Sequence, residues 1–236
     1  MNIEEFLDLV RARRSFRKMK PDPLPQGAVE KILEAGRWAM SGSNAQPWEF
    51  IVVTNQDTKN KLAEAHLATR DEQHVMEMTR VAELRHNVGR STPSVPPFKD
   101  APVLIVVLGD RRTVQASILS TYYIPSEGGP DAIYLKDIAN ATQIMHLAAA
   151  ASGLGSHNVS VSHTMEQLIK PVLNVPEVLD IHTIFVVGYP AAPARTAYRR
   201  ELNEFVHYEK YDRSKFRPGA DIIKFIVKLK TLNLSR

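Results

Sequence analysis

A cluster of guanidinium groups lies near the start of the chain, in Arg13-Arg14-Ser15-Phe16-Arg17. Guanidinium groups bind phosphate oxygens through pairs of parallel hydrogen bonds, and the Ser15 hydroxyl adds one more donor. The pattern therefore fits a phosphate site. A solvated basic surface explains the same residues, because basic runs are common on protein surfaces. A nucleic-acid patch would need further stacking aromatic side chains beside Phe16, and the cluster has none.

A second stretch with chemical potential is polar and rich in small residues, and it reads Ser41-Gly42-Ser43-Asn44-Ala45-Gln46-Pro47-Trp48. Small residues let the backbone approach a flat ligand closely. The carboxamides of Asn44 and Gln46 offer paired donors and acceptors that suit the edge of a heterocycle. The same residues also fit an ordinary polar turn between a helix and a strand.

Two further stretches carry weaker signals. Residues 148–160 (AAAASGLGSHNVS) hold a glycine-flanked strand start, which can expose backbone N–H groups. This is no dinucleotide fingerprint, because no strand precedes Gly153 and the third glycine is missing. The end of a helix explains these glycines equally well. Arg199-Arg200 forms a second arginine pair, which could close on the same phosphate or lie on the surface.

Other chemistries find little support in these 236 residues. The chain has no cysteine, which excludes disulfides, thiolate metal sites and a cysteine nucleophile. Its eight histidines show neither an HExxH motif nor a close pair, so we expect no metal site. There is no GxSxG elbow and no phosphate-binding P-loop. His157, beside Asn158, could contact a substrate or serve a structural role.

The elements that must position these stretches follow from periodicity and composition. Their order (helix, helix, strand, helix, strand, helix, strand) predicts an α/β layered sandwich, with helices covering a sheet. The predicted helices are Ile3 to the basic cluster, Gln26 to Met40, Lys59 to Asn87 and Ile133 to Ser152. The predicted strands are Trp48 to Thr54, Pro102 to Leu108 and Ile181 to Gly188. Ser91 to Asp100 and Ile124 to Asp131 are predicted loops, and residues 222–229 fit a helix or a strand.

Charge and hydropathy indicate which partners and which compartment to expect for the protein. The net charge is +4 and the isoelectric point about 9.2, which suits an anionic small molecule as well as nucleic acid. The longest apolar run, Val103 to Leu108, is far shorter than the roughly 20 residues that span a bilayer. The N-terminus lacks the pattern of a signal peptide. We therefore expect a cytoplasmic protein without a membrane span.

Taken in order, the four stretches resemble the FMN-dependent nitroreductases. Members of that family open with a helix ending in Arg-Arg-Ser-x-Arg and later carry Pro-Ser-x-x-Asn-x-Gln-Pro-Trp, here residues 13–17 and 40–48. An Ala-rich helix then ends in Gly-Leu-Gly, and Gly-Tyr-Pro precedes an arginine pair, here residues 153–155 and 188–200. The resemblance covers about Ile3 to Tyr211.

This chain departs from the family pattern at two prolines. Met40 replaces the first, which changes what packs on the flavin, and Glu201 replaces a second beside the arginine pair. The charge of Glu201 would lie near phosphate unless its side chain turns away. The two predicted loops and the tail beyond Tyr211 are individual to this chain, so they would set the choice of substrate.

The resemblance implies a nitroreductase-like α/β (α+β) three-layer sandwich with a central, mostly antiparallel sheet, assembled as a domain-swapped homodimer. Residues 1–211 would form the FMN-binding domain. Residues 212–236 would form a C-terminal extension that packs on the partner subunit.

The resemblance also implies a non-covalent FMN site in the dimer interface. Arg13, Ser15 and Arg199 would hold the phosphate, assisted by Arg14 and Arg200, and Arg17 would approach the pyrimidine end of the ring. The backbone at residues 158–160 would lie near flavin N5. The residues implied in cofactor binding are Arg13, Arg14, Ser15, Arg17, Ser41, Gly42, Ser43, Asn44, Gln46, Asn158, Val159, Ser160, Arg199 and Arg200. Ser41, Ser43, Asn44 and Gln46 would come from the partner chain.

The implied reaction is a ping-pong hydride transfer. NADH or NADPH would reduce the flavin, which would then reduce an electron-poor small molecule such as a nitroaromatic or a quinone. The flavin carries this chemistry, so no catalytic side chain is required. Two alternatives stay open. One is another flavin enzyme on the same fold: a reductive dehalogenase, a flavin-fragmenting enzyme or a dehydrogenase. The other is a non-enzymatic basic binding module.

Overall fold

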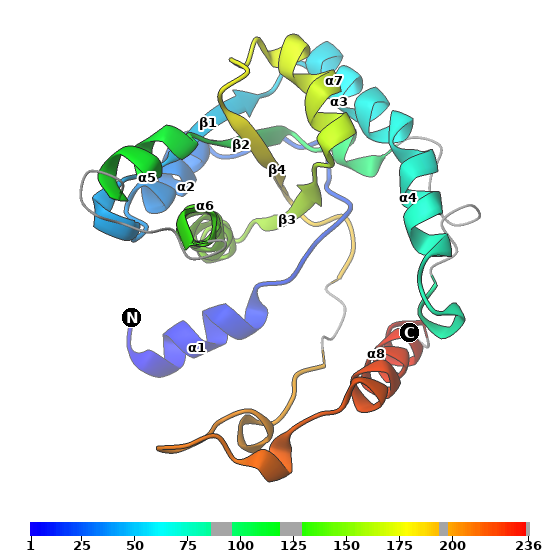
Figure 1. Ribbon diagram of the computed structural model, residues 1–236. Helices are drawn as coiled ribbons and strands as arrows, with labels where there is room; N and C mark the ends of the chain where they lie inside the picture. The colour runs from blue at the N-terminus through cyan, green and yellow to red at the C-terminus, as the bar shows by residue number, and fades with distance from the viewer. Residues whose placement is uncertain (86–95, 119–128, 194–197, 235–236) are drawn as a thin grey trace. The chain divides into compact units, whose positions relative to one another are not determined.

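A four-stranded antiparallel sheet forms the centre of the larger of two structural units (Figure 1). The computed structural model describes residues 1–85, 96–118, 129–193 and 198–234. The strand order is β1-β2-β4-β3, so β2 and β4 are central and β3 is an edge strand. The strands are β1 (Trp48–Val53), β2 (Val103–Gly109), β3 (Gly155–Ser160) and β4 (Asp180–Gly188).

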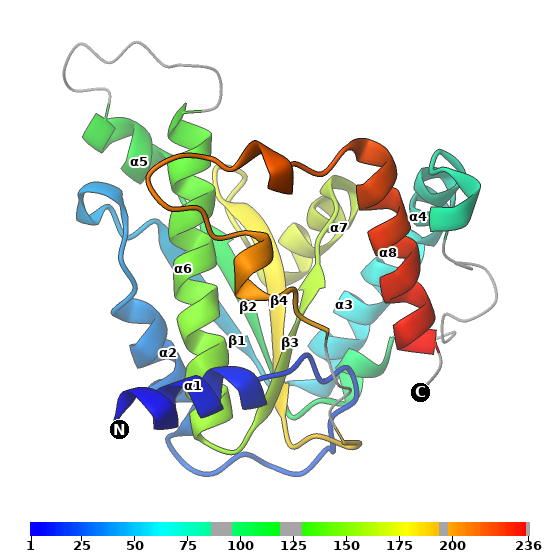
Figure 2. The ribbon, with the colours of Figure 1, turned by 90° about the horizontal axis from the view of Figure 1, so that it is seen from below.

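Helices cover both faces of the central strands (Figure 2). Every residue of β2 is buried for this reason. Alternate residues of a strand point to opposite faces. Leu104 and Val106 pack toward α3 (Gln56–Ala68) and α7 (His163–Leu173). Ile105 and Val107 pack toward α2 (Ala28–Arg37) and α6 (Gly129–Ala151). The predicted three-layer sandwich with an antiparallel sheet is therefore confirmed.

The first helix ends where the basic cluster begins. In α1 (Ile3–Ala12), the Asn2 side chain accepts a hydrogen bond from the Glu5 backbone, and the Glu5 side chain accepts one from Asn2. This reciprocal cap fixes the start of the helix. At Arg13 the backbone leaves helical geometry (φ −59°, ψ 125°), so residues 13–17 continue as an extended segment.

The predicted single helix over residues 59–87 is wrong. Two helices occupy this part of the chain, α3 and α4 (Arg70–Met78), and they are separated at Thr69. The Thr69 hydroxyl donates to the His66 carbonyl at 2.8 Å, which is how a threonine competes with the helical ladder. A 3-10 turn follows at Ala82–Leu84, and Asn87 lies outside the described residues.

The predicted loop over 124–131 is also partly wrong, because α6 already begins at Gly129, while residues 124–128 lie outside the described residues. At the other end of α6, Gly153 adopts a left-handed φ of 71°, which only glycine takes without strain. In the other predicted loop, residues 97–100 form a 3-10 turn, and residues 91–95 lie outside the described part.

Further elements lack a clear signal in the sequence. They are α7 and α5 (Arg111–Ile118), while the glycine-flanked strand start gives β3 only a weak signal. The ambiguous tail is helical, as α8 (Gly219–Leu234).

The two units comprise residues 1–70 with 93–194, and residues 71–92 with 195–236. The second unit holds most of α4, the arginine pair at 199–200, and α8. In the described part of the chain, no helix is long and apolar enough to cross a membrane.

Candidate functional site

The extended segment after α1 runs along the edge strand β3. Ser15 pairs with Ser156 as a parallel bridge, and the Phe16 N–H donates to the Ser156 carbonyl at 3.2 Å. The Phe16 ring packs on Gly155, where a Cβ would lie 2.9 Å from a ring carbon. Gly155 is therefore needed to bring the basic segment against β3.

This pairing determines which backbone groups of β3 face outward. Because the Ser156 carbonyl points away from β4, the residues two and four positions further along, Asn158 and Ser160, turn their backbone groups the same way. Gly155, His157 and Val159 turn theirs toward β4. The open edge of β3 thus presents the N–H groups of Asn158 and Ser160 beside the basic segment.

The three arginines of the segment have different surroundings. Arg14 donates to the carbonyls of Arg11 and Arg13, the latter at 2.8 Å, so its guanidinium caps the end of α1. Arg13 is half-buried and its charge lowers the pKa of His146. Arg17 is exposed and makes no hydrogen bond or ion pair with any described residue. Arg13 and Arg17 therefore offer the positive charge at this edge.

A buried polar network lies behind β3. The His146 ring, from α6, stacks on Phe185 at a centroid distance of 4.6 Å. Its Nδ1 is 2.7 Å from the Ser156 hydroxyl, and its Nε2 is 3.2 Å from Oδ1 of Asn158. Burial, followed by the charge of Arg13, lowers the pKa of His146 to about 4, so the ring is neutral at physiological pH.

His157 lies on the opposite face of β3 and is also buried, with 7% of its surface exposed. Burial lowers its pKa to about 4, helped by the charge of Arg17 and opposed by a hydrogen bond with the Phe16 backbone. Its Nδ1 is buried without a hydrogen-bond partner among the described residues. The neighbouring residue Asn158 is exposed, so Asn158 is better placed than His157 to meet a ligand.

The polar stretch 41–46 is anchored on α6. The Gly42 N–H donates to Oδ1 of Asp137 at 3.1 Å, and the Asn140 amide donates to the Met40 carbonyl at 3.2 Å. A Cβ on Gly42 would lie 2.7 Å from the Ile133 side chain, so only glycine allows this approach. Asp137 is buried, which raises its pKa, and its Oδ2 has no hydrogen-bond partner in the described part of the chain.

The backbone of this stretch is strained. Ser43, Asn44 and Gln46 have φ values of 52°, 56° and 47°, in the left-handed region that side chains disfavour. Such strain persists where the surroundings enforce it, and it gathers at ligand-binding sites. The anchor Asp137 lies nine residues before His146, about 13 Å along the helix axis. Within one chain, the stretch is therefore anchored about two and a half helical turns along α6 from the histidine that Arg13 influences.

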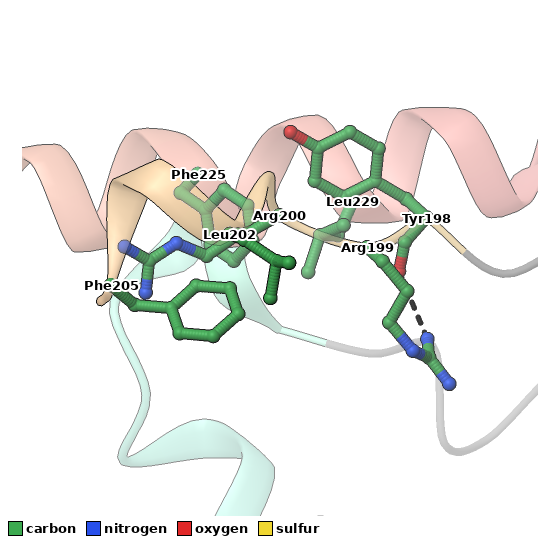
Figure 3. A pocket seen from close by; sticks show the side chains of 7 residues that line it. All are labelled: Tyr198, Arg199, Arg200, Leu202, Phe205, Phe225 and Leu229. Carbon is green, nitrogen blue, oxygen red and sulfur yellow. Dashed lines mark hydrogen bonds between the residues drawn. The ribbon is translucent and has the colours of Figure 1, made fainter. Parts of the chain in front are cut away.

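The arginine pair of the second unit lines a separate pocket of about 550 Å³ (Figure 3). The Arg200 guanidinium donates hydrogen bonds to the Glu204 carboxylate at 3.1 Å and to the Glu204 carbonyl at 2.7 Å. Among the residues that the structure describes, Arg199 donates only to the adjacent Tyr198 carbonyl, at 2.9 Å. Glu201 caps the short 3-10 helix Leu202–Glu204. The lining residues are Tyr198, Arg199, Arg200, Leu202, Phe205, Phe225 and Leu229.

Three polar residues of this arrangement escape the sequence analysis: Asp137, His146 and Ser156. The sequence gives no clear signal for the first two, because α6 also carries other polar side chains, and burial of Asp137 and His146 is what makes hydrogen-bond partners necessary. Their partners at Gly42, Ser156 and Asn158 are not indicated by any local pattern. In the described part of the chain, no group of acidic or histidine side chains could hold a metal ion.

Comparison with known proteins places this geometry in context. The model of the nitroreductase family matches residues 10–189. A putative NADH dehydrogenase/NAD(P)H nitroreductase of Methanothermobacter thermautotrophicus is 27% identical over 211 residues, which is 88% of each chain. An NADH dehydrogenase of Thermus thermophilus is 29% identical over 82% of this chain and 91% of the relative. An iodotyrosine deiodinase of Nematostella vectensis is 25% identical over 86% of this chain and 74% of the relative.

Solved structures share the fold. Nitroreductase A from Vibrio parahaemolyticus superimposes with a TM-score of 0.69 at 20% identity, covering 100% of this chain and 87% of the other. An iodotyrosine deiodinase bound to FMN and 3-iodo-L-tyrosine superimposes with a TM-score of 0.66 at 23% identity, covering 87% and 99%. These likenesses agree with the three-layer arrangement described above.

Proposed function

Because this chain belongs to the nitroreductase family, we propose that it is an FMN-dependent oxidoreductase that takes hydride from NADH or NADPH and reduces an electron-poor small molecule. Nitroaromatics and quinones are the acceptor classes we favour. The observation that carries the proposal is the edge of β3, where Arg13, Ser15 and Arg17 lie beside outward-facing backbone N–H groups.

The donor set at this edge fits FMN. Arg13 and Ser15 would hold the phosphate, and Arg17 would lie at the pyrimidine end of the ring, where a cation stabilises the negative charge of the reduced form. The N–H groups at Asn158 and Ser160, with Val159 between them, would meet the ring edge near N5. Arg17 forms no ion pair with an acidic side chain among the described residues, which keeps its end of the edge receptive to an anion.

The remaining residues complete the site only in an assembly. We propose that Ser41, Gly42, Ser43, Asn44 and Gln46 reach the flavin from the partner subunit of a homodimer, since within one chain they are anchored at Asp137, nine residues along α6 from the histidine beside the basic segment. Arg199 would add a second guanidinium to the phosphate. Arg14 and Arg200 would assist less, because their guanidinium groups already bind carbonyl or carboxylate oxygens.

Bound FMN supplies the chemistry, by accepting and releasing hydride at N5. The chain's own groups orient the ring, neutralise the phosphate and place a cation beside the reduced pyrimidine. No side-chain nucleophile or metal is required for these tasks. The co-substrate and the acceptor would use the same exposed face of the ring in turn, which is what gives ping-pong kinetics.

The test is a visible spectrum of the purified protein, followed by anaerobic titration with NADH and with NADPH. We expect a flavin spectrum that bleaches with one equivalent of NADH or NADPH per flavin. The spectrum should return when a nitroaromatic or a quinone is added. Double-reciprocal plots should be parallel. A protein that takes up no flavin from excess FMN would overturn the proposal.

Reductive dehalogenation is the second candidate, because an iodotyrosine deiodinase matches most of this chain. In that reaction two electrons and a proton replace an aryl carbon–iodine bond with carbon–hydrogen and release iodide. Dithionite-reduced holoenzyme should then release iodide from 3-iodotyrosine. Iodide release without NAD(P)H-dependent nitro reduction would favour this candidate over the first.

A further inference from the structure

The side chain of Asn158 is oriented by its contact with His146. The amide oxygen of asparagine only accepts hydrogen bonds, so the His146 Nε2, 3.2 Å away, must carry the proton of the neutral ring. Nδ1 is then an acceptor, and the Ser156 hydroxyl donates to it at 2.7 Å. With Oδ1 facing inward, the chain of donors runs from Ser156 through His146 to Asn158.

The opposite end of the amide is therefore turned away from His146. Asn158 is exposed, whereas His146 and Ser156 are 7% and 2% exposed. With Oδ1 held inward, the Nδ2 group, which carries two donors, is left for a ligand. It lies on the same strand residue whose backbone N–H also turns outward.

We propose that His146 is a positioning residue that holds Asn158 so that its side chain presents N–H donors, and not a carbonyl, to the flavin ring. This inference rests on the proposed function. An amide turned the other way would direct oxygen lone pairs at a ring that becomes electron-rich on reduction, which is unfavourable. The role is thus to raise flavin affinity and to stabilise the reduced form.

A purely structural role for His146 makes different predictions. The ring stacks on Phe185 and fills space between α6 and β3, so replacing it would lower stability whatever Asn158 does. The positioning role and the structural role can be told apart with substitutions that each keep only one of the two polar contacts of the His146 ring. Glutamine places its amide nitrogen close to the position of Nε2, and asparagine places its own close to Nδ1.

The experiment compares His146→Gln with His146→Asn, using Asn158→Ala and the double variant H146N/N158A to complete a cycle. The exposed histidine at the start of α7, replaced as His163→Gln, is the control. The readouts are the FMN dissociation constant, the reduction potential of the bound flavin and the melting temperature. In addition, ¹⁵N NMR of the flavin-free protein reports which nitrogen of His146 carries the proton.

We expect H146N to raise the FMN dissociation constant about five- to tenfold, the effect of losing one ligand hydrogen bond, and to make the potential more negative. H146Q should restore both. Adding H146N to N158A should cause no further loss of affinity, because the two residues act as one unit. The NMR spectrum should show a protonated Nε2.

The inference fails if H146N and H146Q bind FMN equally well, if the cycle is additive, or if the proton lies on Nδ1. The NMR result does not depend on flavin. Failure of the wild-type protein to bind FMN would refute the proposed function instead, so the two failures are distinct.

Discussion

At the residue scale, the arginines of the basic cluster are unequal although the sequence presents them alike. Arg14 is bound to carbonyl oxygens at the end of α1, and Arg11 forms an exposed ion pair with Asp8 at 2.9 Å. Arg13 lies next to the buried polar network, where its charge acts on His146. Only the structure distinguishes these arginines, because they are the same residue type and lie within four positions of one another in the sequence.

The first prediction is that Arg13→Gln weakens FMN binding about tenfold or more, because a charge-assisted hydrogen bond to phosphate is lost. Riboflavin lacks the phosphate, so its affinity should change little in the same variant. Fluorescence titration of both ligands measures the difference. Arg11→Gln removes the same charge from the exposed ion pair and is the matched control, because such pairs contribute little. An equal loss for FMN and riboflavin in R13Q would contradict the phosphate role.

Contiguous candidate residues carry a signal in the sequence, whereas those joined by long-range contacts carry none. Residues 13–17 and 41–46 carry their chemistry within a few positions. The Asp137 contact with Gly42 spans 95 residues, and the His146 contact with Asn158 spans 12 residues and links a helix to a strand. No local pattern indicates such partners, because Asp137 and His146 stand among other polar residues of α6 and only the fold shows that these two are buried.

At the element scale, strands and helices with strong apolar content were predicted well, and those with polar content were missed. The continuous apolar runs of β2 and β4 have boundaries within one residue of those expected. β3 reads GSHNVS, and it forms a strand because β4 and the basic segment pair with it. α3 and α4 were merged, because the hydroxyl of Thr69 gives no signal in hydrophobic periodicity.

The packing of α6 and β3 also predicts how stability depends on pH. His146 and His157 have pKa values lowered from 6.5 to about 4 in the fold, so the unfolded chain takes up protons first as the pH falls. Their neutral forms therefore stabilise the fold fully above the unfolded pKa of 6.5. This contribution, on the order of 3 kcal/mol for each ring, is lost as the pH falls from 6.5 toward 4.

The second prediction is a steep loss of unfolding free energy over that window, measured by urea denaturation at a series of pH values. Asp137 has the opposite effect on the free energy of unfolding, because burial raises its pKa in the fold. The folded chain therefore takes up this proton before the unfolded chain as the pH falls, which offsets part of the loss. His146→Gln should reduce the slope, because one of the two titrating rings is removed. The exposed His163→Gln should leave the slope unchanged. A slope that is the same in H146Q and wild type would contradict the assignment.

At the scale of the whole molecule, several apolar side chains lie exposed on the chain taken alone. They include Trp38 and Met40, at 74% and 76% exposure, beside the strained stretch 41–46. In the second unit, Ile222 and Ile226 of α8 are exposed at 42% and 37%. We propose that a partner subunit covers these side chains, since exposed apolar surface is a feature of interaction sites. A homodimer that covers these residues is the arrangement our proposal requires, with residues 212–236 packing on the partner subunit.

The third prediction tests that assembly through one face of α8. Ile222 and Ile226 are four residues apart and share a face, whereas Lys224 points away from them. The double substitution I222N/I226N should weaken dimerisation about tenfold or more, because burial of each isoleucine contributes roughly 1.5–3 kcal/mol. Lys224→Gln, on the same helix, should leave it unchanged.

Sedimentation equilibrium across a dilution series measures both variants, and circular dichroism checks that α8 still folds. Flavin content provides the link to function. If the flavin lies between subunits, I222N/I226N should lose FMN as it dissociates into monomers, and both losses should follow the same dependence on protein concentration. A monomer that retains FMN, or a dimer unaffected by the two substitutions, would show that α8 does not complete the site.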